Sequence, residues 1–123
     1  MTQENKELLL KDLCARVTCG VKVLCISDSN HKWYNLKLVD IEENDVYLEA
    51  YEPYTNRYEE IENVKPYLFP MSSMTDGQKT EWDYIDYYAD HHEAVDWLNK
   101  NHFDYRGLID MGLALDATNK SIY

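Results

Sequence analysis

Cysteine and glycine are both scarce in this chain, and their scarcity argues against several kinds of site. The 123 residues include three cysteines and four glycines. Cys14, Cys19 and Cys25 are odd in number and form no CxxC pair, which argues against a disulfide framework and a four-cysteine zinc site. The sequence also has no Walker loop, no GxGxxG motif and no GxSxG motif. No motif therefore points to catalysis.

Long apolar runs are missing as well. No stretch approaches the roughly 20 apolar residues that a membrane span requires. The first residues, MTQENKELLLKDL, have neither the basic start nor the apolar run of a signal peptide. These absences and the cysteine usage predict a soluble protein of the reducing cytoplasm.

Basic residues are few relative to acidic ones, with 12 Lys and Arg against 23 Asp and Glu and a formal net charge of −11. Binding to nucleic-acid phosphates requires concentrated Lys and Arg, so the charge disfavours a nucleic-acid partner. The simplest interpretation of the charge is solubility. The alternative is an acidic face that binds a basic protein.

Aromatic side chains are plentiful but unevenly chosen, with 11 tyrosines and two phenylalanines. Tyrosine suits half-buried positions, because its ring can pack in a core while its hydroxyl reaches water. The length predicts a single domain over residues 1–123.

Helical spacing predicts a helix over residues 5–18, closed by Gly20 in a left-handed conformation. Cys14 lies on its apolar face and is interpreted as a small core residue. The apolar face holds Leu9, Leu10, Leu13, Cys14 and Val17, and the polar face holds Lys6, Glu7, Lys11 and Asp12.

Residues 20–71 change to the alternating period of half-buried strands. We expect strands over residues 21–27, 32–41, 46–51 and 57–64, with turns over 28–31, 42–45 and 52–56. The predicted fold class is α+β, with a small curved antiparallel sheet and helices at both ends. The first choice is an SH3-like barrel of about four to five strands. The alternative is an open antiparallel sheet with helices packed on one face.

The stretch VKPYLFPMSSMTDGQ, residues 64–78, contains Pro66 and Pro70. Proline has no amide hydrogen, so we expect this segment to be extended but to leave the sheet. Tyr67 and Leu68 are expected to be buried across the core. Thr75 and Gln78 match a capping box, which predicts that a helix begins after Thr75.

A helical segment is predicted over residues 75–112, followed by a loose tail over 113–123. Its first helix spans 76–88 and carries Trp82, Ile85, Tyr88 and Ala89 on one side. Asp90 is expected to cap a second helix that ends near Asn101 and turns Val95, Leu98 and His102 inward. Asp104 is expected to cap a third helix over 105–111, closed by Gly112.

Tyrosines are interleaved with acids in residues 40–62 and 76–104. Such a mixture is either an ordinary solvated face with half-buried tyrosines or a surface that binds a basic protein. The candidate partner surface consists of Glu49, Tyr51, Glu52, Tyr54, Tyr84, Asp86, Tyr87 and Asp90.

The pair His91–His92 invites a metal interpretation, with Asp86, Asp90 or Glu93 nearby. Adjacent helical residues point about 100° apart, whereas helical zinc ligands are spaced by three or four residues. We therefore expect no metal site, and we assign no cofactor and no catalytic residue.

The phrases KELLLKDLCARV, GVKV, VKPYLFPMSSMT and DWLNKNHFDYRGLIDMGLAL span most of the chain. Together they resemble a group of small uncharacterised proteins of gut anaerobes and their phages or mobile elements. The resemblance implies a mobile-element setting and no particular activity, cofactor or site residue.

The sequence thus predicts a non-enzymatic accessory interaction protein, whose partner is a basic protein or complex. Two alternatives stay open. One is a small enzyme with a carboxylate-lined pocket, and the other is a nucleic-acid-binding small barrel, which the charge disfavours.

Overall fold

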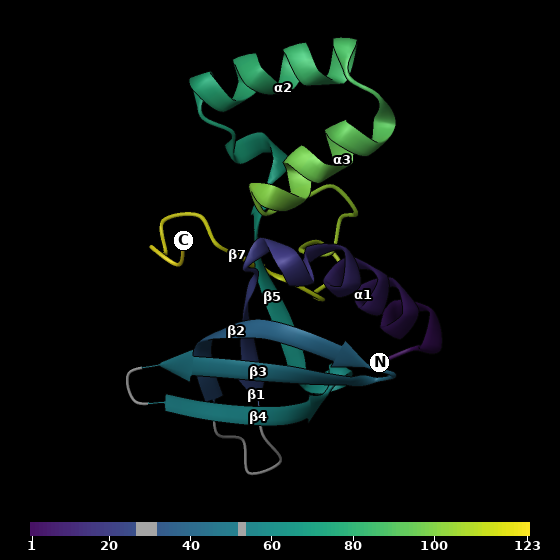
Figure 1. The fold of residues 1–123 in the computed structure, drawn as a ribbon, viewed down its shortest axis with the longest axis vertical. Coiled ribbons are helices and arrows are strands. Elements are labelled where there is room, and N and C mark those ends of the chain that lie inside the picture. Colours follow the sequence, from purple (N-terminus) through teal and green to yellow (C-terminus); the bar gives the residue numbers. More distant parts are fainter. Residues whose placement is uncertain (27–31, 52–53) are drawn as a thin grey trace.

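The computed structural model describes residues 1–26, 32–51 and 54–123, and it has an N-terminal helix, a mostly antiparallel sheet and C-terminal helices (Figure 1). The predicted α+β class is confirmed. In the described part of the chain, no helix combines the length and the apolar character needed to cross a membrane. The elements are α1 (Gln3–Arg16), η1 (Val17–Cys19), β1 (Lys22–Ile26), β2 (Lys32–Glu42), β3 (Asp45–Tyr51), β4 (Tyr54–Glu60), η2 (Ile61–Asn63), β5 (Val64–Pro70), η3 (Met71–Ser73), α2 (Asp76–Tyr88), α3 (His91–Lys100), β6 (Phe103–Asp104) and β7 (Leu115–Asp116).

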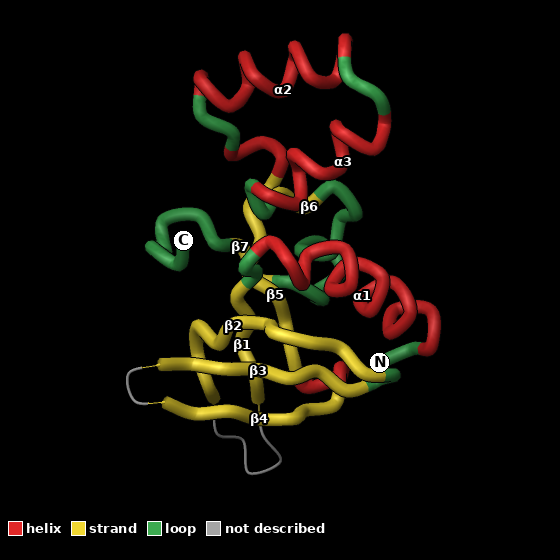
Figure 2. The backbone as a smooth tube through the Cα atoms, viewed as in Figure 1, coloured by secondary structure: helices red, strands yellow, loops and turns green. Residues whose placement is uncertain are grey.

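The sheet has seven strands in the order β4-β3-β2-β1-β5-β6, with β7 also paired to β5. β1 to β4 form an antiparallel meander as expected, but the fourth strand, predicted over 57–64, ends at Glu60 and is followed by η2. Within the described residues the pairing does not close on itself, so the SH3-like barrel is not confirmed, and the open sheet is the better description (Figure 2). The expected turn over 52–56 is wrong for residues 54–56, which begin β4 because they pair with β3. The expected turn over 28–31 lies outside the described residues.

β5 corrects the prediction that residues 64–70 leave the sheet. Pro66 pairs with Val23 of β1, in antiparallel register. Further along, β5 pairs in parallel with β7 at Tyr67 and Leu68 and with β6 from Phe69 onward. Proline is tolerated because at Pro66 the strand has β1 as its neighbour on one side and no paired strand on the other in the described residues.

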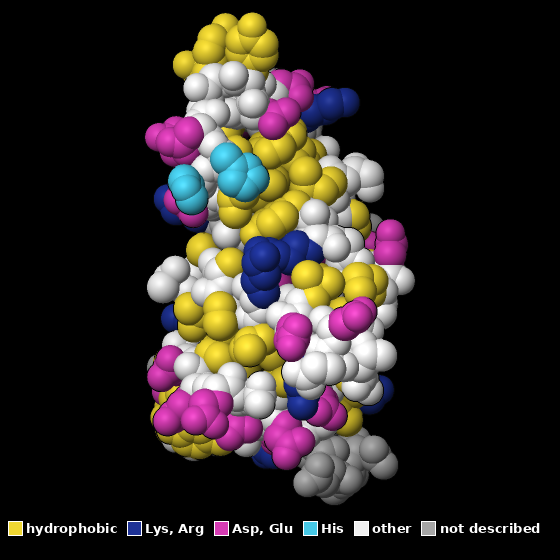
Figure 3. Space-filling view, turned by 90° about the vertical axis from the view of Figure 1, so that its right-hand side faces the viewer, with side chains coloured by type: hydrophobic (Ala, Val, Ile, Leu, Met, Phe, Trp, Pro, Cys, Tyr) yellow, Lys and Arg dark blue, Asp and Glu magenta, His cyan; other side chains and the backbone are white. Residues whose placement is uncertain are grey.

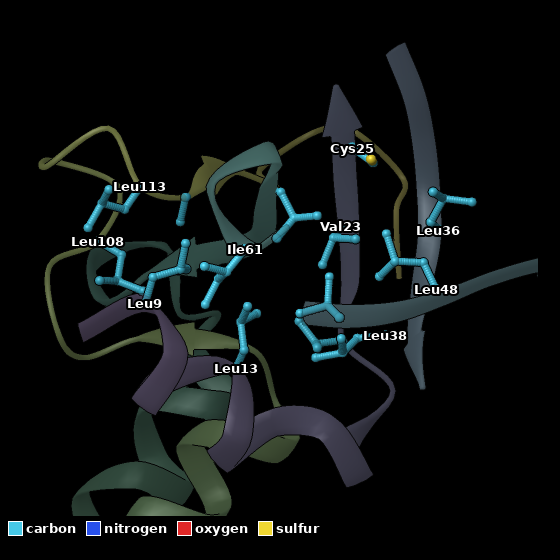
Figure 4. Packing of buried hydrophobic residues seen from close by; sticks show 14 of the residues in the cluster. Leu9, Leu13, Val23, Cys25, Leu36, Leu38, Leu48, Ile61, Leu108 and Leu113 are labelled. Carbon is cyan, nitrogen blue, oxygen red and sulfur yellow. The ribbon is translucent and has the colours of Figure 1, made fainter. Parts of the chain in front are cut away.

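The core forms where α1 packs against the sheet (Figure 4). Tyr67 and Leu68 are buried, as the sequence predicted. Cys14, in contrast, is exposed, so its assignment to the core is wrong; Leu9 and Leu13 supply the buried stripe of α1. The main cluster contains Leu9, Leu13, Val21, Val23, Cys25, Leu36, Leu38, Val46, Leu48, Ile61, Val64, Leu68, Leu108, Leu113 and Ala114.

The predicted caps of α2 and α3 are confirmed. The Gln78 amide donates to Thr75 Oγ1 at 3.1 Å, and the Thr75 amide donates to Gln78 Oε1 at 2.9 Å. Before α3, Asp90 Oδ1 accepts from the Glu93 amide at 2.9 Å. These short-range patterns set where α2 and α3 begin.

The predicted third helix over 105–111 does not form. Asp104 instead accepts from two backbone amides, those of Leu108 and Ile109, each at 2.9 Å. The carboxylate holds a series of turns that ends at Gly112, which has a φ of 74°. Asp104 was therefore identified as an amide-binding residue, but the segment that it organises is a loop.

The tail over 113–123 is not loose. Ala117 is 2% exposed, and its amide donates to the Leu68 carbonyl at 2.8 Å. The Tyr123 hydroxyl accepts from the Lys22 amide at 2.9 Å and donates to the Tyr67 carbonyl at 2.8 Å. The tail is held because it completes the outer side of β5, where it covers a second small core of Leu24, Tyr67 and Ala117.

Candidate functional site

Helix α2 projects at the end of the molecule opposite to β3 and β4 (Figure 1). Its 13 residues include no buried side chain. Tyr84, Tyr87 and Tyr88 are 66%, 80% and 69% exposed. Their rings contact one another, with centroid distances of 4.8 Å for Tyr84–Tyr88 and 4.7 Å for Tyr87–Tyr88. We call these three residues the tyrosine ridge. The sequence had predicted Tyr88 on the same side of the helix as Trp82. That prediction is wrong, because Tyr88 is exposed and belongs to the tyrosine ridge.

The side of α2 that faces α3 is also apolar, through Trp82, Ile85 and Ala89. The Trp82 ring stacks on Trp97 of α3 with a centroid distance of 5.7 Å. Trp97 in turn stacks on the buried Phe103 at 5.7 Å, which ties α3 to the end of β5. The ring stack that joins α2 to α3 is therefore made by two half-exposed side chains.

A groove of about 270 Å³ lies between the two helices. Its floor is apolar, from Ile85, Ala89 and Trp97, and its rim is charged. Glu93, Asp96 and Lys100 supply the rim, all from α3. The groove was not identified from the sequence, because its two walls come from separate helices whose relative placement no local pattern indicates.

Negative charge surrounds the tyrosine ridge and the groove. Within residues 1–26, 32–51 and 54–123, none of the carboxylates on α2, on α3 or between them forms an ion pair. Figure 3 shows hydrophobic and acidic side chains side by side in the upper part of the molecule, which contains α2 and α3. The carboxylates are Asp76, Glu81, Asp83, Asp86, Asp90, Glu93 and Asp96, against Lys79 and Lys100.

Of the eight residues proposed from the sequence, the seven that the structure describes fall on two separate parts of the molecule. Tyr84, Asp86, Tyr87 and Asp90 lie on α2 or directly after it. Glu49 and Tyr51 in β3 and Tyr54 in β4 lie at the opposite end of the molecule (Figure 1). Glu52 lies outside the described residues.

The β3–β4 surface is more tightly bonded than α2. The Tyr54 hydroxyl accepts from Asn56 Nδ2 at 3.2 Å, and Glu49 is half-buried. The hydrogen bond with Tyr54, together with burial, raises the pKa of Tyr47 to about 12. Tyr47 and Tyr54 thus have partners within the sheet, whereas the side chains of the tyrosine ridge contact one another.

A buried ionic cluster links α1 to the loop after α3. Asp12 was predicted on the polar face, but Asp12 and Arg16 are both 0% exposed. Arg16 Nε donates to Asp12 Oδ2 at 3.0 Å, and Arg106 Nη1 donates to Asp12 Oδ1 at 2.8 Å. Arg16 Nη2 also donates to the Phe103 carbonyl at 2.6 Å. The Arg106 guanidinium lies over the Tyr105 ring, 4.6 Å from its centroid. These contacts hold α1 against the C-terminal half, so we assign the cluster a structural role.

His102 lies between the sheet and the tail. Its ring stacks on Tyr123 with a centroid distance of 3.7 Å and a 12° interplanar angle. Burial, and then the charges of Arg16 and Lys22, lower the pKa of His102 to about 4. Burial also raises the pKa of Tyr123 to about 12. The His102 imidazole is therefore neutral in the folded protein at pH 7.

We expect this histidine to make the fold sensitive to acid. The unfolded chain protonates His102 near pH 6.5, whereas the folded chain does so near pH 4. The unfolded state binds more protons between these values, so the free energy of unfolding falls as the pH decreases from 6.5 to 4. His102→Asn should flatten this dependence in urea titrations, and asparagine tolerates the φ of 62° at this position. The exposed His91→Asn is the control, and an equally steep dependence in both variants would contradict the assignment.

Two further kinds of chemical site are a group of metal ligands and a carboxyl group whose pKa is shifted. Among the residues that the structure describes, no three His, Cys, Asp or Glu side chains stand together as a metal-binding group would. The rings of His91 and His92 are 6.3 Å apart. A hydrogen bond and the charge of Lys6 lower the pKa of Glu62, and hydrogen bonds from Thr118 lower that of Asp116. Both shifts have local causes outside the groove.

Comparison with known proteins adds no relative to this picture. No protein-family profile, no curated protein and no solved structure matches the chain.

Proposed function

We propose that the protein is a non-enzymatic interaction module that binds a basic protein or complex through α2. The contact residues are Tyr84, Asp86, Tyr87 and Asp90, with Tyr88 completing the tyrosine ridge. The observation that carries the proposal is the exposure of three adjacent tyrosines on a helix that buries none of its own side chains. The sequence phrases that resemble mobile-element proteins support an accessory role in a phage or mobile element.

Helix α2 packs less of its apolar surface than a stable helix of its length usually does. A helix of 13 residues is marginal alone, and most helical stability in proteins comes from packing an apolar face. α2 has apolar side chains on two opposite sides but packs on one of them only. Contiguous exposed apolar side chains are typical of interaction sites, and tyrosine is enriched in interface hot spots. A partner that covers the ridge would supply the missing packing.

The negative charge around the tyrosine ridge favours a partner with a basic surface. Asp83, Asp86 and Asp90 are exposed and have no ion pair in the described part of the chain. Complementary charge steers association and is screened by salt, so a basic partner should bind faster at low ionic strength. The enzyme alternative is not adopted, because no described feature favours it.

We expect the double variant Tyr84→Ser/Tyr87→Ser to lose the partner while remaining folded, because both side chains are exposed. The measurement is affinity purification from the native host, with identification of bound proteins at low and high salt. Tyr54→Ser is the matched control, since it removes a 59% exposed tyrosine from the β3–β4 surface. Binding that survives the double variant but is lost in Tyr54→Ser would move the site to β3–β4 and contradict the proposal.

A further inference from the structure

The groove between α2 and α3 is distinct from the tyrosine ridge, because it lies on the opposite side of α2. Trp82, Ile85 and Ala89 repeat at intervals of three and four and so share one helical side. Tyr84 and Tyr87 fall on the other side at the same periodicity. A partner on the ridge alone would leave the groove uncovered.

We propose that this groove receives a basic amphipathic helix from a partner protein, with its apolar side chains on the groove floor. The inference rests on the proposed function and names the chemistry of the partner segment. Apolar grooves are the setting in which amphipathic helices bind, through anchors at i, i+3, i+4 and i+7.

The apolar floor of the groove suits the apolar side of such a helix. Ile85, Ala89 and Trp97 line a space of about 270 Å³, and all three are half-exposed. The floor is also fixed in position, since Trp97 is stacked between Trp82 and the buried Phe103. Apolar anchors entering a preformed site lose little free energy to reorganisation of the protein.

The charged rim of the groove suits basic side chains on the partner helix. Glu93 and Asp96 lie three residues apart on the groove side of α3, with Lys100 as the basic residue of the rim. Residues 76–100 contain seven acids and two bases, a net charge of −5. Lysines or arginines flanking the apolar stripe of a bound helix would complement this rim. A second copy of this chain is a poor occupant, because each copy carries a formal charge of −11.

The test uses a synthetic helical peptide with Leu at i, i+3, i+4 and i+7 and Lys elsewhere, and a twin with Glu in place of Lys. The measurement is fluorescence anisotropy of the labelled peptides with the full chain. We expect the Leu/Lys peptide to bind and the Leu/Glu peptide not to bind. Ile85→Glu should weaken Leu/Lys binding by about tenfold or more, because it places a charge on the apolar floor.

Thr80→Glu is the matched control, since it adds the same charge at an exposed position of α2. It should leave the Kd within about twofold or strengthen binding slightly. Added negative charge strengthens a purely electrostatic complex, so weakening by Ile85→Glu identifies apolar anchoring. Circular dichroism should show both variants folded, because α2 contains no buried residue.

The remaining outcomes separate the two proposals. Equal peptide binding by Ile85→Glu and Thr80→Glu, or no Leu/Lys binding at all, overturns the groove inference and leaves the ridge proposal to host purification. Loss of peptide binding in Tyr84→Ser/Tyr87→Ser alone also overturns it, since the peptide would then occupy the ridge. A dimer in sedimentation that Ile85→Glu dissociates would show a second copy in the groove and contradict a basic partner helix.

Discussion

Asp12→Ala is expected to lower the free energy of unfolding by about 3–5 kcal/mol, because it breaks a buried ionic cluster. Asp12 is 0% exposed and pairs with both Arg16 and Arg106. Its removal leaves the buried Arg16 guanidinium with the Phe103 carbonyl and no carboxylate in the described residues. Urea denaturation followed by circular dichroism measures the change against a total that is typically about 5–15 kcal/mol.

Arg16→Met should cost less than Asp12→Ala, because Asp12 then keeps Arg106 at 2.8 Å. The exposed Asp110→Ala is the matched control and should change stability by less than about 0.5 kcal/mol. Should Asp12→Ala fail to fold, Asp12→Asn keeps the shape and tests the charge alone. The assignment of a structural role is contradicted if Asp12→Ala unfolds at the same urea concentration as Asp110→Ala.

The sequence predicted best those features that residues close in the chain determine. The Thr75–Gln78 capping box and the Asp90 cap are each formed within four residues, and both are present. Gly20 has the expected left-handed conformation, with a φ of 73°. The meander was also predictable, because alternation within a strand requires no knowledge of its distant partner.

Features that depend on distant partners were not predictable from the same patterns. Pro66 signals the end of a strand unless one knows that, among the described residues, β1 alone pairs with it. Likewise, nothing in DATNKSIY indicates that Tyr123 contacts Lys22 and Tyr67. Asp12 looked like a surface acid, because one of its two partners, Arg106, is 94 residues away and its burial depends on that distant contact. The missed features are therefore those that only the assembled fold creates.

The candidate site, too, was predictable only in part. The acid and tyrosine composition identified Tyr84, Asp86, Tyr87 and Asp90 without the structure. Composition alone also grouped them with Glu49, Tyr51, Glu52 and Tyr54, since it does not say which segments are neighbours. The signal that could have separated the groups is the spacing of Trp82, Ile85 and Ala89, which marks one apolar side of a helix and leaves Tyr84 and Tyr87 on the other.

The second large effect is expected at Leu68. Leu68→Ala should lower the free energy of unfolding by about 2–5 kcal/mol, because it leaves a cavity in a packed core. Leu68 is 0% exposed and lies in β5 between the meander and the tail, in contact with the main cluster. Chemical denaturation should show the loss in the transition of the whole sheet. Lys65→Ala, at a half-buried position of the same strand, is the control and should cost far less.

Thr75→Ala should cost less, about 0.5–2 kcal/mol, because it removes a cap at an exposed helix end. The structure also predicts where the loss appears. α2 buries no side chain and is coupled to α3 through the Trp82–Trp97 stack, so its opening can precede that of the sheet. Amide hydrogen exchange should therefore become faster in α2 of Thr75→Ala, with the transition of the sheet nearly unchanged. A matching shift of the whole transition would show instead that α2 unfolds together with the sheet. The pairing of β5 with β1, β6 and β7 implies that this strand fixes the two halves of the molecule together. A neutral Leu68→Ala would contradict that role. Cleavage of the native chain by a protease between Tyr67 and Ser73 would contradict it as well.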